Sequence, residues 1–156
     1  MIVRTSAILF GTAVVAALAA VAGWWWWSQL GRPEIRPTDP TQVRLGEVVY
    51  RQRCASCHGV NLEGQPDWRI RMPNGRLPAP PHDASGHTWH HPDQVLFDIT
   101  KLGLGPFAPP DYESDMPAFE GVLTDGEIRA VIAYIMSQWP EEILGRQQRI
   151  DLQAAQ

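Results

Sequence analysis

The hydrophobic pattern begins with one long uncharged run near the N-terminus. Residues 7–27 carry no charged side chain, and the run ends in four consecutive tryptophans, Trp24 to Trp27. As a helix this run would be roughly 31 Å long at about 1.5 Å per residue, which matches a bilayer core of about 30 Å. Tryptophan favours the membrane interface, and Arg4 predicts a cytoplasmic N-terminus. Residues 1–27 are therefore predicted to be a transmembrane anchor, with the chain after Ser28 on the outer side.

A cleaved signal peptide is the alternative explanation of this run. Ala20, Val21 and Ala22 have the small-x-small form of a cleavage site. However, the apolar core of a signal peptide is usually about 7–15 residues long, which is shorter than this run. Cleavage there would also leave the tryptophans close to the mature N-terminus. A buried core helix is a poorer explanation because the run has no polar face. The anchor and the signal peptide both export the rest of the chain.

The chain after the anchor divides into three parts. Residues 28–42 contain three prolines and one glycine among polar side chains, which predicts a semi-rigid linker. Residues 43–140 are predicted to form one small domain. Residues 141–156 form a polar tail with a few aliphatic side chains, which is expected to be a surface helix or a frayed end.

Three segments of the predicted domain show helical spacing of apolar residues. They cover residues 43–54, residues 92–102 and the segment that follows Thr124. The third is the clearest, because Thr124 and Glu127 form a capping-box pattern at its start. Long loops rich in Gly and Pro are predicted between them, at residues 59–91 and 103–121. The expected fold class is all-α.

Composition narrows the range of functions. The chain has 156 residues, of which 44% are hydrophobic and 19% charged, so one packed domain is expected. Its net charge of -4 argues against nucleic-acid binding, which needs a basic excess. Residues 84–145 hold ten acidic and two basic side chains. This half of the chain presents either an acidic surface that steers a basic partner or an ordinary solvated surface.

The most informative segment is Cys54-Ala55-Ser56-Cys57-His58. Cys-x-x-Cys-His is the attachment pattern of c-type haem, because thiols one helical turn apart reach the two vinyl groups of one porphyrin and the adjacent imidazole lies beneath the iron. A redox dithiol would be expected next to a βαβ pattern, and a zinc site needs two further ligands. A disulfide across two residues is strained. The pattern predicts one covalent haem c on Cys54 and Cys57, with His58 as an iron ligand.

With this motif, the chain resembles the class I c-type cytochromes, in particular the small bacterial monohaem proteins that are anchored to the membrane. The residues that carry the resemblance are Gly46, Tyr50, the segment 54–59, Asn61, Leu62, Gly64, Met116, Pro117, Ala118, Phe119, Val131 and Tyr134. It covers about residues 43–139. The resemblance implies a cytochrome c-like helical domain around one haem, in which the first and last helices cross near Gly46.

Several side chains could supply the sixth iron ligand. The candidates are Met72, Met116, Met136, His82, His87, His90 and His91. Met136 falls on the last helix, where packing is the better explanation, and Met72 follows His58 too closely to cross to the other haem face. Met116 lies in a Pro-rich loop, in a Met-Pro-x-Phe sequence that matches the family, and is the predicted ligand. One of the histidines is the alternative, which would give a bis-His haem of lower potential.

The sequence also indicates which residues surround the haem. In the family that the chain resembles, a proline carbonyl after the haem motif accepts a hydrogen bond from the ligating histidine, and Pro80 is the expected residue here. Trp89 is expected either to donate its indole N–H to a haem propionate or to pack against the haem edge. The four histidines of residues 82–91 could also bind copper or zinc, although no fixed spacing identifies a site.

With both axial positions filled, the haem can only exchange electrons. The resemblance therefore implies a single-pass protein of the inner membrane whose haem domain lies on the periplasmic side. It would carry single electrons between partners such as a quinol:cytochrome c reductase and a terminal oxidase or reaction centre. One alternative is a stoichiometric haem c subunit of a larger oxidase, reductase or dehydrogenase complex. A peroxidase or gas sensor is the third possibility and requires an open or displaceable sixth site.

Overall fold

The computed structural model describes residues 17–25 and 34–156. The chain divides into two compact units, Met1–Pro33 and Glu34–Gln156. In the first unit, residues 17–25 are helical. Within the described residues, no helix is both long enough and apolar enough to cross a bilayer. The predicted anchor, residues 1–27, lies largely outside the described part of the chain and stays a prediction.

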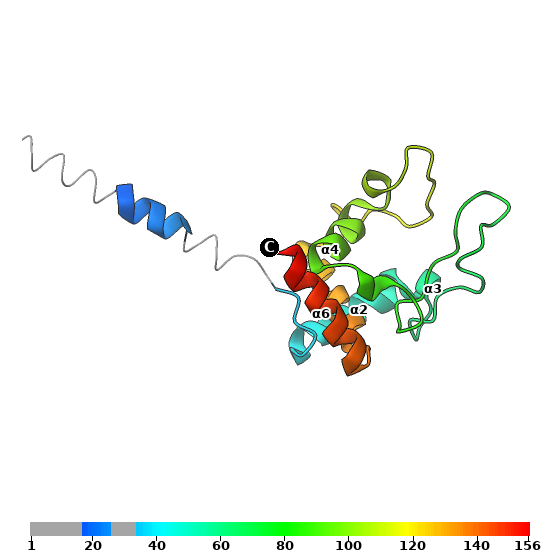
Figure 1. The fold of residues 1–156 in the computed structure, drawn as a ribbon, viewed down its shortest axis with the longest axis horizontal. Helices are drawn as coiled ribbons and strands as arrows, with labels where there is room; N and C mark the ends of the chain where they lie inside the picture. Colours follow the sequence, from blue (N-terminus) through cyan, green and yellow to red (C-terminus); the bar gives the residue numbers. More distant parts are fainter. Residues whose placement is uncertain (1–16, 26–33) are drawn as a thin grey trace, which may run out of the picture. The chain divides into compact units, whose positions relative to one another are not determined.

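The second unit is built from helices and long loops (Figure 1). Its α-helices are α2 (Pro40–Arg53), α3 (Ala55–His58), α4 (Asp93–Leu102), α5 (Asp125–Ser137) and α6 (Glu141–Ala154). Two short 3₁₀-helices, η1 (Thr88–His90) and η2 (Gly105–Phe107), interrupt the loops. Residues 34–156 contain no β-strand, so the all-α prediction is confirmed for this unit.

The packed unit begins earlier than the sequence pattern predicted. The α2 helix begins at Pro40, because the carboxylate of Asp39 accepts hydrogen bonds from the backbone N–H groups of Thr41 and Gln42. Ile35 is buried in the core. Of the segment predicted as a linker, residues 28–42, the described residues 34–42 thus contribute to the packed unit, where Ile35 adds apolar contact and Asp39 caps the helix.

The core forms where α2 packs against α5. A Cβ atom on Gly46 of α2 would overlap the carbonyl oxygen of Ala130 on α5, so only glycine allows this close approach. The crossing expected near Gly46 is therefore present. The α5 helix begins with the predicted capping box of Thr124 and Glu127 and is buried along most of its length.

The C-terminal segment belongs to the packed unit. The α6 helix packs against η1, and the side chain of Gln147 is 1% exposed. Its Nε2 donates to Asp93 Oδ1 at 2.7 Å, and the backbone N–H of Asp93 donates to Asp151 Oδ1 at 2.9 Å. The domain thus continues past residue 140, because α6 holds the start of α4 and the segment that carries η1.

Candidate functional site

The two cysteines and His58 lie on one turn at the end of α2. The backbone N–H groups of Cys57 and His58 both donate to the carbonyl oxygen of Cys54, at 3.1 and 2.9 Å. Both thiols are free; Cys54 is half-buried and Cys57 is exposed. Burial, and to a smaller extent the neighbouring Cys57, raises the pKa of the Cys54 thiol to about 11. Redox dithiols work with a lowered thiol pKa, so this environment does not suit the dithiol alternative.

His58 is oriented by the loop that follows it. Its side chain is buried, and its Nδ1 lies 2.8 Å from the carbonyl oxygen of Pro80. A carbonyl can only accept, so Nδ1 carries the proton and Nε2 keeps its lone pair for a metal. Burial lowers the pKa of His58, although the hydrogen bond to Pro80 opposes this. The neutral imidazole that results is the form that binds iron, and the hydrogen bond predicted for Pro80 is present.

Gly64 allows the loop to return to His58. Its backbone N–H donates to the carbonyl oxygen of His58 at 2.8 Å, and its φ is +67°. A Cβ atom at this position would overlap the backbone at Pro80 and Pro81. Gln65 then pairs with Ala79 through two hydrogen bonds, of 2.9 and 3.0 Å. This close pairing brings the carbonyl of Pro80 to the imidazole.

His82 is a site residue whose role sequence reasoning missed. Its ring stacks on that of His58, with centroids 4.0 Å apart and planes 21° apart. Its Nδ1 shares a hydrogen bond of 2.8 Å with Thr88 Oγ1, and its carbonyl accepts from Trp139 Nε1 at 2.7 Å. To bind one iron together, two imidazoles must each point a ring nitrogen at it from opposite sides, whereas these two rings lie face to face. This arrangement does not favour His82 as the sixth ligand.

The other histidines of this loop make ring contacts. His87 stacks on Trp68 with ring centroids 5.4 Å apart, and His91 lies edge-on to His87 at 5.6 Å. Across residues 17–25 and 34–156, no group of three or more His, Cys, Asp or Glu side chains is arranged to hold a metal ion. The geometry therefore gives no support to a second metal site.

Trp89 on η1 has an unpaired donor. Its indole Nε1 is buried without a hydrogen-bond partner among the described residues. Buried donors are almost always paired, so this group fits the prediction that Trp89 donates to a haem propionate. The residues present therefore fit a c-type haem: two thiols are free, the Nε2 of one imidazole is available, and this indole N–H lacks a partner among the described residues.

The three methionines considered as sixth ligand lie in different settings. Met136 is 2% exposed in the core of α5, which agrees with packing. Met72 lies in a tight hairpin, where its N–H donates to the carbonyl of Arg76 at 2.8 Å. Met116 lies half-buried in the loop before α5, and its N–H donates to Ser114 Oγ at 3.0 Å. Iron ligation by Met116 stays a prediction.

Comparison with known proteins gives one match. The family model described as cytochrome c matches residues 43–139. A search of curated proteins and a search of solved structures each gave no match. The matched segment runs from the first turn of α2 to Trp139, so it contains the motif at residues 54–58, Pro80, Trp89 and Met116 and ends before α6.

Proposed function

The chain belongs to the cytochrome c family, and from this premise we propose that it is a membrane-anchored monohaem electron carrier that works on the periplasmic side of the inner membrane. Family membership makes it an electron-transfer haem protein. Beyond this, we propose the membrane anchor, the single haem, the periplasmic location and the partners.

The observation that carries this function is the hydrogen bond from His58 Nδ1 to the carbonyl of Pro80, next to two free thiols on the same turn. Cys54 and Cys57 would hold the haem through thioethers, and His58 would offer Nε2 to its iron. When bound, a haem supplies a one-electron Fe(III)/Fe(II) couple. The stacked ring of His82 and the carbonyl of Pro80 hold the imidazole in one orientation, and the Pro80 carbonyl keeps the proton on Nδ1.

Met116 is proposed as the residue that closes the other axial position. A thioether is a soft, uncharged donor, which favours ferrous iron and raises the potential. Two filled axial positions leave no place for a substrate, which supports a carrier rather than a peroxidase or gas sensor.

The proposed partners are a quinol:cytochrome c reductase as donor and a terminal oxidase or reaction centre as acceptor. The uncharged run of residues 7–27 and its tryptophans support an anchor that would keep the domain near such membrane complexes.

The experiment that tests this function begins with native membranes solubilised in mild detergent. Haem stain should stay on the polypeptide in a denaturing gel and should disappear in the double variant Cys54→Ala, Cys57→Ala. An oxygen pulse given to reduced membranes should oxidise the haem in the presence of an oxidase. Purification of the chain only within a fixed-ratio complex would favour the subunit alternative. Haem extractable by acid acetone would contradict covalent attachment.

A further inference from the structure

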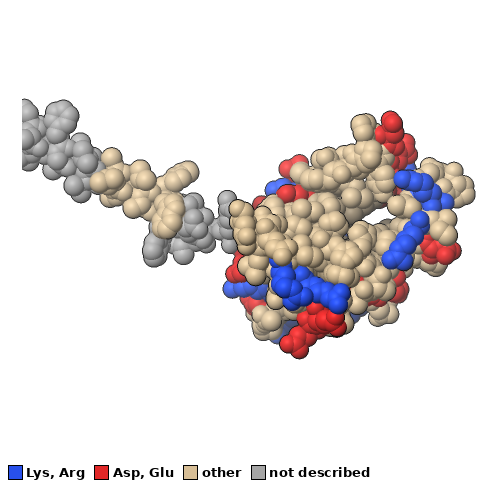
Figure 2. Space-filling view, in the orientation of Figure 1, with Lys and Arg blue, Asp and Glu red and all other residues tan. Residues whose placement is uncertain are grey.

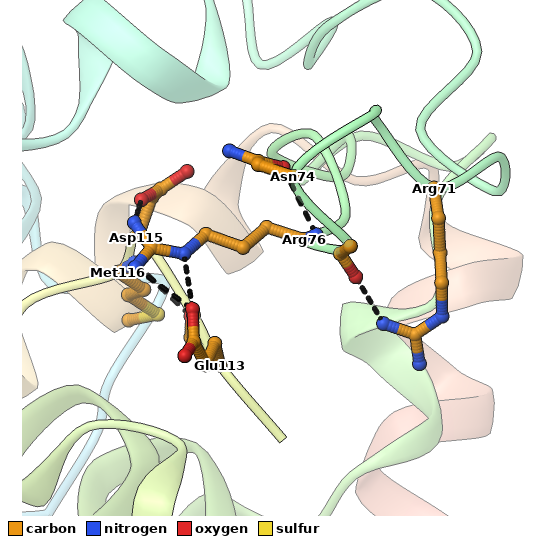
Figure 3. A network of polar contacts seen from close by, with 8 residues as sticks. Arg71, Asn74, Arg76, Glu113, Asp115 and Met116 are labelled. Atoms are coloured by element: carbon orange, nitrogen blue, oxygen red, sulfur yellow. Dashed lines mark hydrogen bonds and ion pairs between the residues drawn. The ribbon is translucent and has the colours of Figure 1, made fainter. Parts of the chain in front are cut away.

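A hairpin in the loop after α3 contacts the loop that carries Met116. Arg76, in this hairpin, donates from Nε and Nη2 to Glu113 Oε2 at 3.2 and 3.0 Å, and from Nη1 to Asp115 Oδ1 (Figure 3). Glu113 and Asp115 lie three positions and one position before Met116 along the chain. In Figure 2 the segments after α3 and after α4 stand on either side of an opening, with basic side chains beside it. Arg76 therefore connects two loops that are far apart in sequence.

The hairpin is ordered by its own hydrogen bonds. The N–H of Gly75 donates to the carbonyl of Met72 at 2.8 Å, and the N–H of Arg76 donates to Asn74 Oδ1 at 3.0 Å. Arg71 donates to the carbonyl of Gly75 at 2.5 Å, and its guanidinium lies 5.6 Å from the ring centroid of Tyr112 in the facing loop. The guanidinium of Arg76 is thus presented to the facing loop by a pre-formed turn.

Among the ion pairs of the described residues, the Arg76 interaction is the one in which a single base binds two carboxylates. An isolated, exposed ion pair contributes little to stability. Arg76 is 35% exposed and serves two carboxylates, whereas Arg51 is 60% exposed and pairs with Glu47 one turn away on α2. Charge-assisted hydrogen bonds to a planar guanidinium also impose a direction on their partners. Arg76 can therefore restrict where the segment 113–116 lies.

Arg76 also connects this segment to the His58 side of the site. Pro80, whose carbonyl accepts a hydrogen bond from His58 Nδ1, lies four positions further along the chain. Gln65 pairs with Ala79 and holds the base of the hairpin. One stretch of chain, residues 76–80, thus contacts both the loop of Met116 and the ring of His58.

We propose that Arg76 is a positioning residue for Met116: by binding Glu113 and Asp115 together, it holds the Met116 loop closed and keeps the thioether sulfur at the haem iron. This inference rests on the proposed function in one respect, since it takes Met116 as the sixth ligand. Loss of the Arg76 charge would release the loop and allow external ligands to compete with the sulfur, without changing covalent haem attachment.

The test uses the full-chain holoprotein and the variant Arg76→Gln, with Arg51→Gln as the matched control. Imidazole is added to the ferric protein, and the rate of its binding is followed by the loss of the methionine–iron absorption band. Arg76→Gln should bind imidazole about tenfold faster, the factor expected for losing a charge-assisted contact. Arg51→Gln should behave like the wild type, and Arg76→Lys should restore part of the difference. Added salt should accelerate binding in the wild type, because it screens the Arg76 pairs, and should have less effect in Arg76→Gln.

Further variants distinguish a wrong positioning role for Arg76 from a wrong assignment of Met116 as the ligand. If Arg76→Gln keeps the wild-type band, imidazole rate and salt response, the positioning role is wrong. If Met116→Ala leaves the oxidised spectrum unchanged, the ligand assignment itself is wrong and the Arg76 inference is overturned with it. If Arg76→Gln does not fold, the double variant Glu113→Gln, Asp115→Asn removes the same contacts from the other loop. This double variant should show the same acceleration, and a wild-type imidazole rate in it would overturn the proposal.

Discussion

The imidazole of His82 lies face to face with that of His58, at a ring-centroid distance of 4.0 Å. Burial, with smaller contributions from His58 and His87, lowers the pKa of His82 well below its ordinary value. The ring is therefore a neutral, flat packing surface at physiological pH. Its hydrogen bond with Thr88 and the bond from Trp139 to its carbonyl fix it beside His58, the proposed iron ligand.

Replacing His82 tests this stacking. His82→Ala should lower the free energy of unfolding by about 2 kcal/mol, because it leaves a cavity and an unpaired Thr88 hydroxyl. His82→Leu should lower the free energy of unfolding by less, because the leucine side chain fills most of the volume of the imidazole. Denaturant unfolding of the holoproteins measures both, with His87→Ala as a control on an exposed ring of the same loop. Equal losses for all three variants would contradict a specific role for the stacked ring.

As the proposed sixth ligand, Met116 would decide whether the haem carries electrons or binds small ligands. Met116→His should keep a six-coordinate, low-spin haem with a lower potential, because a harder nitrogen stabilises Fe(III) more than a thioether does. Met116→Ala should open the site to cyanide or CO. Redox titration and ligand-binding spectra measure these effects. Met72→Ala is the control and should change neither the potential nor the binding of external ligands. If a substitution of Met72, or of a histidine of residues 82–91, abolishes the wild-type oxidised spectrum, Met116 is not the ligand.

Gln147 links α6 to Asp93, and this link should depend on pH. Burial raises the pKa of Asp93 above its ordinary value of 3.8, while the hydrogen bond from Gln147 partly lowers it again. Gln147→Leu removes the donor and so raises the pKa of Asp93 further, which makes its charged form more costly in the folded state. The free energy of unfolding of the variant should be about 2 kcal/mol lower than that of the wild type at pH 7. This loss should shrink as the pH falls through the raised pKa of the variant, and should level off below the folded pKa of the wild type, because Asp93 is then protonated in both folded proteins. The unfolded carboxyl titrates in the same way in both proteins and does not change the difference.

Denaturant unfolding at a series of pH values measures this effect. Gln148→Leu is the matched control, because Gln148 is exposed on the same helix. A loss for Gln147→Leu that is independent of pH would show that packing, rather than the Asp93 hydrogen bond, accounts for the role of α6.

The anchor can be tested without knowledge of the partners. Removing residues 1–27 and supplying a cleavable signal should give a haem protein in the soluble periplasmic fraction, whereas the full chain should sediment with membranes. The measurement is haem stain in each fraction. N-terminal sequencing of the mature protein that begins at Gly23 would show instead that the run is a cleaved signal peptide.

Contacts between near neighbours in the chain were predictable from the sequence. The thiols of Cys54 and Cys57 and the ring of His58 share one helical turn because their spacing is local, and Thr124 caps α5 through a residue only three positions away. The Pro80 hydrogen bond was predictable only through resemblance to a family, because it joins residues 22 positions apart.

Tertiary structure decided what the local pattern could not. The stacking of His82 on His58, the contact of Arg76 with Asp115 across 39 positions and that of Gln147 with Asp93 across 54 positions all depend on the path of the long loops. Nothing in the periodicity distinguishes His82 from its neighbouring histidines, or Gln147 from Gln148. Such pairs depend on how α2 and α5 pack, because this packing determines where each loop and α6 can lie.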